Sequence, residues 1–300
     1  MSGLGNAPVS FGIFGTTAGS AAPADMLRAL AASGYDGCEL GPPGLFGSPS
    51  QAASLFDEVG LDAIGAYVPL HLALDDATFE DDLRRMALTC EELAATGAPL
   101  AILADEGSPE LLVNPARVDT TLALDSRAWA RAAERLARAV DLARSNGLAA
   151  SFHPHISTYV ESAWEVERLL ETSDVSLTLD IGHMALAGAD PAACVLDWSS
   201  RIDHVHIKDV DLGVLQRAKE QSRTDFDEWW ADVCVPLGSG DVDIDAVLAA
   251  LADHRYAGWL VVEQDRAPTS AEELNAVASV QQDNLSWLAP RWAQARGANP

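Results

Sequence analysis

Two stretches of the chain decide its fold: Leu177-Thr-Leu-Asp-Ile-Gly-His183 and, one strand later, Ile202-Asp-His-Val-His-Ile-Lys-Asp209. Each is a short apolar run whose last residues turn into Asp, His or Lys. Apolar runs of this length between turn signals are typical of buried parallel strands. In parallel α/β proteins the chemistry takes place just past the carboxyl ends of the strands. We therefore expect a site at Asp180, His183, His206 and Lys208.

The rest of the chain repeats this strand-then-helix pattern at intervals of roughly thirty residues, as βαβ units require. Strands are predicted at residues 9–15, 35–40, 61–71, 99–104, 148–152, 175–181, 202–209 and 259–263. Helices are predicted at residues 24–33, 50–59, 78–96, 126–145, 161–172, 191–200, 215–232, 244–254 and 270–288. Eight strands with helices between them predict a closed (β/α)8 TIM barrel. An open doubly wound sheet is the alternative, but no Gly-x-Gly-x-x-Gly motif follows the first strand.

The composition agrees with one barrel and excludes some kinds of partner. The chain has 300 residues with no break in composition, so we expect a single domain over residues 1–300. That domain has a long insertion after the seventh strand, at about 210–242, and a C-terminal helix at about 270–288. The net charge of −26 repels phosphate backbones and anionic lipid, which argues against nucleic acid and membrane partners.

The cysteines and the apolar segments indicate in which cellular compartment the protein is expected. The four cysteines form no Cys-x-x-Cys pair and are expected to be free thiols of a reducing compartment. We see no signal peptide and no apolar run of the roughly 20 residues that a membrane span needs. We therefore expect a cytoplasmic protein that acts on a small molecule. The oligomeric state stays open, a homo-oligomer included.

Side chains alternate along a strand, so polar groups from four successive strands are predicted to face the barrel interior. They are Ser151, His153 and His155, then Thr178 and Asp180, then His204, His206 and Lys208, and finally Glu263. Two imidazoles and two carboxylates at the rim form a mixed nitrogen and oxygen ligand set. That set is His153, Asp180, His206 and Glu263. It suits one divalent ion, Mn or Co, with Zn, Fe or Mg as alternatives.

Each of these residues also has a structural interpretation. An inward histidine is often only hydrogen-bonded within the core, and Asp180 alone is equally suited to cap the next helix. His204 lies one layer deeper than His206, and we interpret it as a structural or supporting residue. Four such residues on four consecutive strands favour the metal site. An ion with two open positions could chelate a hydroxy-ketone and stabilise an enediolate when the α-proton leaves.

Several motifs resemble those of a known superfamily. Asp180-Ile-Gly-His183, His204-Val-His206-Ile-Lys-Asp209, Pro236-Leu-Gly-Ser-Gly-Asp-Val242 and Val261-Val-Glu263 are similar to motifs of the xylose-isomerase-like sugar phosphate isomerases and epimerases. The resemblance spans the chain and implies a (β/α)8 barrel with a divalent ion at its top. Gly34-Tyr-Asp-Gly-Cys-Glu-Leu-Gly41, Ala104-Asp-Glu106 and Phe152-His-Pro-His-Ile-Ser-Thr-Tyr-Val160 resemble inosose dehydratases within it. Those enzymes dehydrate 2-keto-myo-inositol in inositol catabolism.

The resemblance implies roles for individual residues. Asp180, His206 and Glu263 match metal ligands, and His183 matches a substrate-binding histidine. One position departs from the pattern, because ketose 3-epimerases of this superfamily have a Glu at the end of strand five where this chain has His153. An epimerase needs two carboxylates on opposite faces of one carbon, so this replacement puts the two-base mechanism in doubt.

A dehydratase needs less symmetry. One base removes the proton α to the ketone, and one acid protonates the departing β-hydroxyl. Glu263 is the candidate base, or a ligand next to the base. Further candidates act as the acid or contact substrate hydroxyls, and they are Lys208, His155 and Glu39. Tyr67 and His71 end the third strand and are candidates to line the pocket.

Three alternatives stay open at this point. The chain could be a metal-dependent sugar or keto-polyol isomerase or epimerase, or a degenerate barrel that acts as a binding or partner subunit. Metal-dependent apurinic endonucleases share the barrel, but seven histidines and the acidic charge do not suit their three-metal cluster and DNA substrate. In the insertion, Phe226, Trp229 and Trp230 either pack the inserted helix on the barrel, which we favour, or cap the pocket or contact another subunit.

Overall fold

The computed structural model describes residues 3–13, 20–117 and 120–297. Within these ranges the main sheet is parallel, and its nine strands follow the order β3-β2-β1-β11-β8-β7-β6-β5-β4. The two strands at its ends, β3 (Asp62–Ala63) and β4 (Gly65–Leu70), are consecutive parts of one extended segment. That segment pairs with β2 on one side and with β5 on the other, so the sheet closes on itself. The predicted TIM barrel is confirmed.

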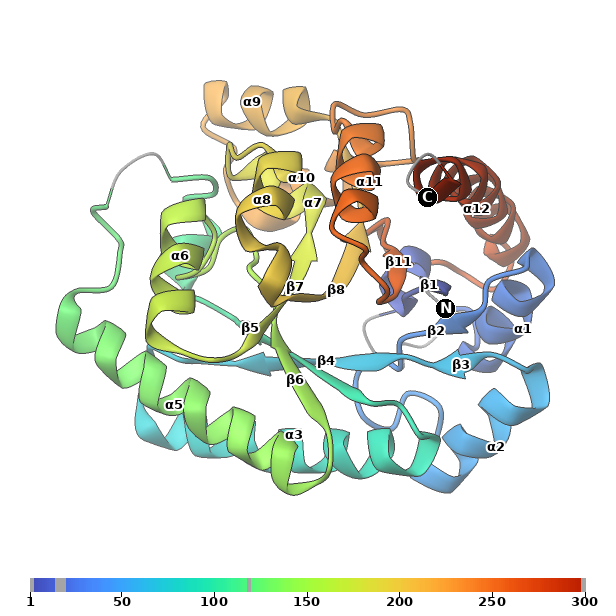
Figure 1. Ribbon diagram of the computed structural model, residues 1–300, viewed down its shortest axis with the longest axis horizontal. Coiled ribbons are helices and arrows are strands. Elements are labelled where there is room, and N and C mark those ends of the chain that lie inside the picture. Colours follow the sequence, from blue (N-terminus) through green and yellow to red (C-terminus); the bar gives the residue numbers. More distant parts are fainter. Residues whose placement is uncertain (1–2, 14–19, 118–119, 298–300) are drawn as a thin grey trace.

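The remaining barrel strands are short, as is usual for a closed parallel sheet. They are β1 (Leu4–Asn6), β2 (Gly37–Cys38), β5 (Leu100–Asp105), β6 (Ala149–Phe152), β7 (Ser176–Asp180), β8 (Ile202–Ile207) and β11 (Leu260–Val262). The helices around them are α1 (Pro23–Ser33), α2 (Pro49–Val59), α3 (Asp76–Thr96), α5 (Ser126–Ser145), α6 (Ala163–Thr172), α8 (Pro191–Trp198), α11 (Ile244–Asp253) and α12 (Leu274–Gly297). Figure 1 shows these helices arranged around the strands.

Local sequence signals set the ends of several helices. The Ser48 side chain accepts a hydrogen bond from the backbone N–H of Gln51, and the Gln51 side chain accepts one from the backbone of Ser48. This capping box satisfies two N–H groups that the first turn of α2 leaves free. Asp75 caps α3 in a similar way. That helix ends at Gly97, whose φ of 76° lies in the left-handed region that glycine adopts without strain.

The apolar residues of the strands divide between the two faces of the barrel wall. Leu177, Leu179 and Val205 belong to the main core between the strands and the helices. Inside the barrel, Ile64 and Val261 pack together with Ala7. Each strand is thus buried on both sides, which is why its apolar run is nearly continuous in the sequence.

A buried amide network attaches α12 to the barrel. The Asn6 side chain donates to Gln281, and Gln281 donates to Gln264 at 3.2 Å. Asn284 also donates to Gln264, and its own oxygen accepts from the backbone N–H of Leu237. Burying amides is favourable only when they are hydrogen-bonded to one another in this way. The network fixes the chain just after β11, next to Glu263.

The prediction for the first strand was wrong. The strand is Leu4–Asn6, and the predicted span begins inside a 3-10 helix, η1 (Pro8–Phe11). Pro8 has no backbone N–H to give to a sheet, and Gly12 turns the chain with a φ of 64°. Residues 14 and 15 of the prediction lie outside the described residues. The true strand was missed because Leu4-Gly-Asn6 is too short and too poor in apolar residues to show a pattern.

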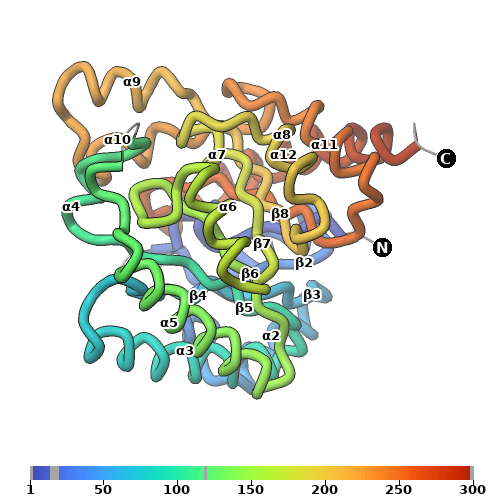
Figure 2. The backbone as a smooth tube through the Cα atoms, turned by 60° about the vertical axis from the view of Figure 1, so that its left-hand side comes forward, coloured from blue at the N-terminus to red at the C-terminus, as the bar shows by residue number. Residues whose placement is uncertain are grey.

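The segment between β8 and α11 also differs from the prediction. The helix expected at 215–232 is two helices, α9 (Leu212–Glu220) and α10 (Phe226–Val233). Between them Ser222 adopts a φ of 54°, which interrupts the helix. Two short strands, β9 (Asp209–Val210) and β10 (Cys234–Val235), pair antiparallel at the base of this segment. Figures 1 and 2 show α9 and α10 together on one side of the barrel.

Four further observations concern the helices and the cysteines. A short helix, α7 (Ile181–Leu186), follows β7 directly and was not predicted. The last helix begins at Leu274 and ends at Gly297, later at both ends than predicted. None of the helices within the described ranges has the length and apolar character that a membrane span requires. The four cysteines are free and buried.

Candidate active site

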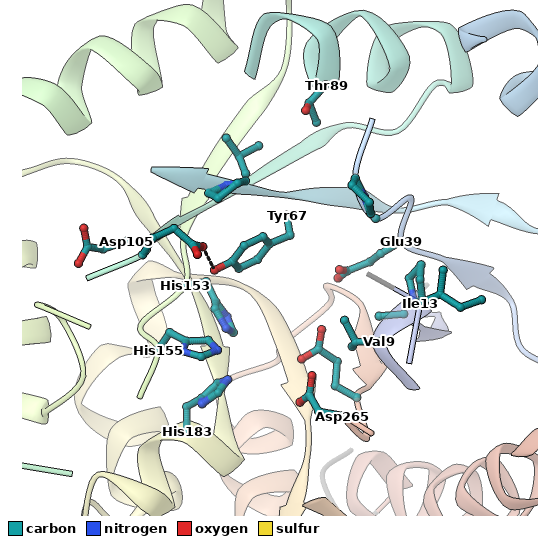
Figure 3. Close-up of a pocket in the computed structure, with 18 of the residues that line it drawn as sticks. Val9, Ile13, Glu39, Tyr67, Thr89, Asp105, His153, His155, His183 and Asp265 are labelled. Atoms are coloured by element: carbon teal, nitrogen blue, oxygen red, sulfur yellow. Dashed lines mark hydrogen bonds between the residues drawn. The ribbon is translucent and has the colours of Figure 1, made fainter. Parts of the chain in front are cut away.

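A cavity of about 530 Å³ opens at the carboxyl ends of the barrel strands, a volume in the range of small-molecule sites. Its wall includes seven of the predicted site residues, several of which Figure 3 labels. These are Glu39, Tyr67, His153, His155, His183, Lys208 and Glu263. Asp180 and His206 are buried beneath this wall and are not among the described lining residues. The four predicted metal ligands therefore lie at the floor of the cavity, partly below its surface.

The strands place these four side chains next to each other. His153 directly follows β6, and its backbone N–H still bonds to the oxygen of Leu103 at 2.7 Å. Asp180 is the last residue of β7, and His206 lies opposite it in the register of β8. Glu263 directly follows β11 and continues the ladder to β8. Consecutive parallel strands thus bring the ends of four sequence segments to one place.

The ligand atoms lie at distances that one ion could bridge. His153, Asp180 and His206 each offer one atom, and these atoms are within 4.8 Å of one another. His206 Nδ1 is 3.7 Å from Asp180 Oδ2 and 3.2 Å from Glu263 Oε2. Ligands about 2.1 Å from a shared ion are at most about 4.2 Å apart, so the set is close to coordination geometry.

Buried polar atoms without hydrogen bonds support a cation site between these four side chains. Among the described residues, the buried Nδ1 atoms of His153 and His206 and the Oδ2 atom of Asp180 have no hydrogen bond of good geometry. Lys208 Nζ lies 2.9 Å from Asp180 Oδ2 as an ion pair. Buried polar atoms are almost always satisfied, so several unsatisfied atoms facing one point call for a missing partner. A divalent ion fits this donor set.

Asp180 has both of the roles that its sequence position suggested. Its Oδ1 atom accepts from the backbone N–H groups of Gly182 at 2.8 Å and His183 at 2.9 Å, and so caps α7. Its Oδ2 atom faces His206 and Lys208 instead. Capping fixes the carboxylate plane, so the second oxygen is held in one direction before any ligand binds.

The charges of the site follow from burial and from close neighbours. Burial lowers the pKa of His153 well below its usual value, so its ring is neutral and one of its nitrogens offers a lone pair. Burial also opposes charge on His206, but the carboxylates of Glu263 and Glu39 outweigh it and raise that pKa well above the usual value.

The carboxylates are held in their charged form. Burial alone would raise the pKa values of Glu39, Asp180 and Glu263, but nearby imidazoles lower all three below their usual range, and the Lys208 ammonium adds to this effect at Asp180 and Glu263. A metal-bound His206 would be neutral, and the three buried carboxylates would then face one ammonium, which leaves two negative charges. One divalent ion would neutralise them, which is a second sign that the residues fit a metal ion.

Lys208 is fully buried at the centre of these charges. Its Nζ lies 2.9 Å from Asp180 Oδ2, 3.0 Å from Glu263 Oε2 and 2.6 Å from Asp265 Oδ2. Burial disfavours an ammonium, but these carboxylates raise its pKa well above the usual value. A Cβ atom at Gly182 would lie 2.7 Å from Lys208 Cγ. The glycine of the Asp-Ile-Gly-His motif therefore makes room for the lysine stem.

Asp209, the residue after Lys208, organises the glycine-rich loop Pro236–Val242. Its Oδ2 atom accepts from the backbone N–H groups of Gly238 at 2.8 Å and Gly240 at 2.9 Å. Its Oδ1 atom accepts from Val210 and Val242. A Cβ atom at Gly240 would lie 2.3 Å from Asp209 Oδ1, so only glycine fits there. The Lys-Asp pair and the Pro-Leu-Gly-Ser-Gly-Asp-Val sequence form one structural unit that holds the end of β8.

Aromatic rings from the insertion form one side of the cavity. Trp230 stacks on His183 with an interplanar angle of 2° and ring centroids 5.3 Å apart. Phe226 also stacks on Trp230, with ring centroids 4.7 Å apart. Both line the cavity, whereas Trp229 is buried in a separate core cluster. The packing interpretation is therefore right for Trp229 but incomplete for Phe226 and Trp230, which pack against the same cluster and also line the cavity. His155 lies against His183, with ring centroids 3.9 Å apart.

Of the two pocket residues predicted at the end of the third strand, Tyr67 and His71, one lines the cavity and one does not. Tyr67 lines the cavity, and its hydroxyl donates to Glu106 at 2.8 Å, as the dashed line in Figure 3 marks. His71 is not among the described residues that line it, because its ring turns outward to Asp82 at 3.1 Å. The predicted pocket position of His71 is wrong, because β4 ends at Leu70 and His71 lies beyond the end of the strand.

The cavity also contains acidic residues that the sequence did not single out. Glu106 faces Tyr67, and Asp265 contacts Lys208. Burial raises the pKa of Asp265, although Lys208 opposes the effect. Asp265 continues the alternation of Val261 and Glu263 by one more inward position, so that spacing could have identified it. Asp105, whose pKa burial raises to about 6, bonds to the backbone of Leu72, Gly107 and Tyr159 and organises the rim.

Comparison with known proteins gives consistent matches over most of the chain. A family model described as xylose isomerase-like TIM barrel matches residues 27–289. The rhizopine catabolism protein MocC of Rhizobium meliloti is 32% identical over 272 residues, which cover 88% of this chain and 80% of that protein. An inosose dehydratase of Halalkalibacterium halodurans is 27% identical over 261 residues, 86% of this chain and 84% of that enzyme.

Two solved structures are similar in fold. An L-ribulose 3-epimerase has a TM-score of 0.73 at 18% identity, with 99% of this chain and 97% of that one covered. The IOLI protein, solved with a bound zinc atom, has a TM-score of 0.71 at 16% identity, with 95% and 98% covered. At these identities the likeness concerns the barrel and its connections.

Proposed function

This chain belongs to the xylose isomerase-like TIM barrel family, and from that premise we propose that it is a divalent-metal-dependent hydro-lyase that dehydrates an inosose-type keto-polyol. The observation that carries the proposal is the convergence of His153, Asp180 and His206 within 4.8 Å, with Glu263 beside them, at the floor of a cavity of about 530 Å³. The inosose dehydratases among the relatives support the substrate class.

The proposed ligands are His153, Asp180, His206 and Glu263. When bound there, a divalent ion supplies a Lewis acid that polarises the substrate ketone and stabilises negative charge on its oxygen. Two nitrogen and two oxygen ligands suit Mn or Co, with Zn, Fe or Mg as alternatives. The protein's own contribution is to hold these ligands rigidly and to surround the ketone with charged groups in a largely buried cavity.

Glu263 is the proposed base. Its carboxylate is charged, lines the cavity and is held by Lys208 Nζ at 3.0 Å. It accepts the proton from the carbon next to the ketone, and the electron pair of that C–H bond moves toward the carbonyl. The C–O bond to the β-hydroxyl then breaks as the carbon–carbon double bond forms.

Lys208 is the proposed acid, because its ammonium lies at the cavity floor and contacts Glu263 and Asp180. It gives a proton to the departing hydroxyl, which leaves as water. His155, His183 and Tyr67 line the same cavity and are proposed to bind the remaining hydroxyls of the ring. Burial keeps the pKa values of both histidines low, so each neutral ring offers a donor and an acceptor.

The test is incubation of the purified protein with 2-keto-myo-inositol and Mn²⁺ or Co²⁺. We expect loss of water and an absorbing enone-type dione, followed by ultraviolet absorption and mass spectrometry. An isomeric inosose of unchanged mass would overturn the dehydratase proposal in favour of an isomerase or epimerase. Bound metal without turnover of any keto-polyol would instead favour a binding subunit.

A further inference from the structure

His206 lies between two different sets of acidic groups. Its Nε2 atom is 3.0 Å from Glu39 Oε1, while its Nδ1 atom faces Glu263 Oε2 at 3.2 Å and Asp180 Oδ2 at 3.7 Å. The histidine and the three carboxylates are all buried. One ring nitrogen therefore points to the proposed ion, and the other points away from it to a carboxylate from the far side of the barrel.

The contact with Glu39 determines which nitrogen carries the proton. A charged carboxylate only accepts hydrogen bonds, so the Nε2 atom of His206 must be a donor. In a neutral imidazole the other nitrogen then has a free lone pair. That nitrogen is Nδ1, the same atom that has no hydrogen-bond partner of good geometry among the described residues.

His204 holds Glu39 in this position. Its Nε2 atom lies 2.8 Å from the same Glu39 Oε1 atom, and the two imidazole rings are almost perpendicular at 82°. His204 and His206 are two residues apart on β8, so both face the barrel interior. Glu39 follows β2, so one oxygen atom ties the two strands together across the barrel. An oxygen with two imidazole donors is poorly placed to act as an acid.

We propose that Glu39 is a positioning residue that keeps the His206 proton on Nε2 and so directs Nδ1 to the metal ion, with His204 as its support. The inference rests on the proposed metal site and replaces the catalytic role first considered for Glu39. Groups that hold the outer nitrogen of a metal-bound histidine fix its orientation and raise its basicity, and their loss typically weakens metal binding about 10–100-fold. Glu39, His204 and His206 do not form a second metal site, because they already satisfy one another.

The experiment compares the Mn²⁺ affinity of the wild type, Glu39→Gln and Glu106→Gln by isothermal titration calorimetry. Glu39→Gln keeps the size of the side chain but removes the charge that His206 faces, so we expect affinity to fall roughly 10–100-fold. Glu106→Gln is the matched control, because it neutralises a carboxylate of the same cavity that bonds to Tyr67 and, within the described part of the chain, to no imidazole. We expect its affinity to stay near the wild-type value.

A second readout follows the histidine itself. In the zinc-loaded wild type with 15N-labelled histidine, the His206 Nε2 proton should resonate downfield and exchange slowly, and in Glu39→Gln it should move upfield. Wild-type affinity and an unchanged His206 signal in Glu39→Gln would overturn the inference and leave the proposed function standing. Equal weakening in Glu39→Gln and Glu106→Gln would also overturn it, because charge alone would then explain the effect. A wild type that binds no ion would overturn both.

Discussion

Replacing Glu263 with glutamine is expected to lower kcat/KM for 2-keto-myo-inositol by roughly 10³-fold or more. The substitution removes the proposed base, whose contribution is of the order of 10²–10⁴-fold, and weakens a proposed metal ligand as well. The fold should remain, because Glu263 lies at the rim of the barrel and not within its apolar core. Steady-state kinetics at saturating metal, together with thermal unfolding, measures both effects.

The matched control is again Glu106→Gln, which changes a carboxylate of the same cavity to an amide of the same size. We expect its kcat/KM to stay within about tenfold of the wild type, since the glutamine oxygen can still accept from the Tyr67 hydroxyl and the loss of charge on the acceptor is worth about 1 kcal/mol. Turnover by Glu263→Gln within tenfold of the wild type would remove Glu263 from the proposed chemistry. Loss of the cooperative unfolding transition in Glu263→Gln would instead show that the role of Glu263 is structural.

Removal of the metal ion is expected to abolish turnover and to lower thermal stability. An ion present at a hundred times its dissociation constant stabilises the folded state by about 2.7 kcal/mol, or roughly 4 °C in the unfolding temperature of a 300-residue chain. Dialysis against a chelator should lower both quantities, and Mn²⁺ or Co²⁺ should restore them. Elemental analysis measures the ion content in parallel.

Asp180→Asn is the control variant for this experiment. Asparagine caps a helix about as well as aspartate, so α7 should keep its cap while the charge at Oδ2 is lost. After dialysis against the chelator, this variant should stay folded. Added Mn²⁺ or Co²⁺ should then change neither its turnover nor its unfolding temperature. Full turnover of the wild type with no measurable metal would contradict the metal-dependent mechanism.

The barrel could be predicted from the sequence because the strands are buried on both faces. Runs such as Leu100–Ala104 are continuous in apolar residues, and the helices between them end at clear signals such as Gly60 and Gly97. The first strand escaped prediction because Leu4–Asn6 owes its place to pairing with β2 and β11 and not to its own composition. The helix around Ser222 was predicted without a break because nothing local marks the change there.

The candidate site was predictable where strand alternation alone decides it. That rule identified His153, Asp180, His206 and Glu263, which the structure brings together at the ends of β6, β7, β8 and β11. Contacts between distant strands carry no such signal. The bond from Glu39 to His206 joins residues 167 positions apart, so only the closed barrel reveals that this carboxylate holds an imidazole.

The insertion between β8 and α11 also shows contacts that the sequence alone could not predict. Phe226, Trp229 and Trp230 are neighbours in the sequence, yet one is buried in a core cluster and the other two line the cavity. The helical spacing of α10 sends Trp229 toward Leu215 and Val233, and turns the adjacent Trp230 toward His183. Which face of a helix meets a barrel depends on how the helix docks, and that is a property of the tertiary structure.

Diffraction from a crystal of the Mn²⁺-loaded protein, recorded at a wavelength where manganese scatters anomalously, tests the account at its centre. We predict one strong anomalous peak at the cavity floor, about 2.0–2.4 Å from His153 Nδ1, Asp180 Oδ2, His206 Nδ1 and a Glu263 oxygen. A peak held instead by His153, His155 and His183, which also lie within 4.8 Å of one another, would contradict the proposed ligand set. A fully loaded crystal with no peak near Asp180 and His206 would end the metal-based explanation of the activity.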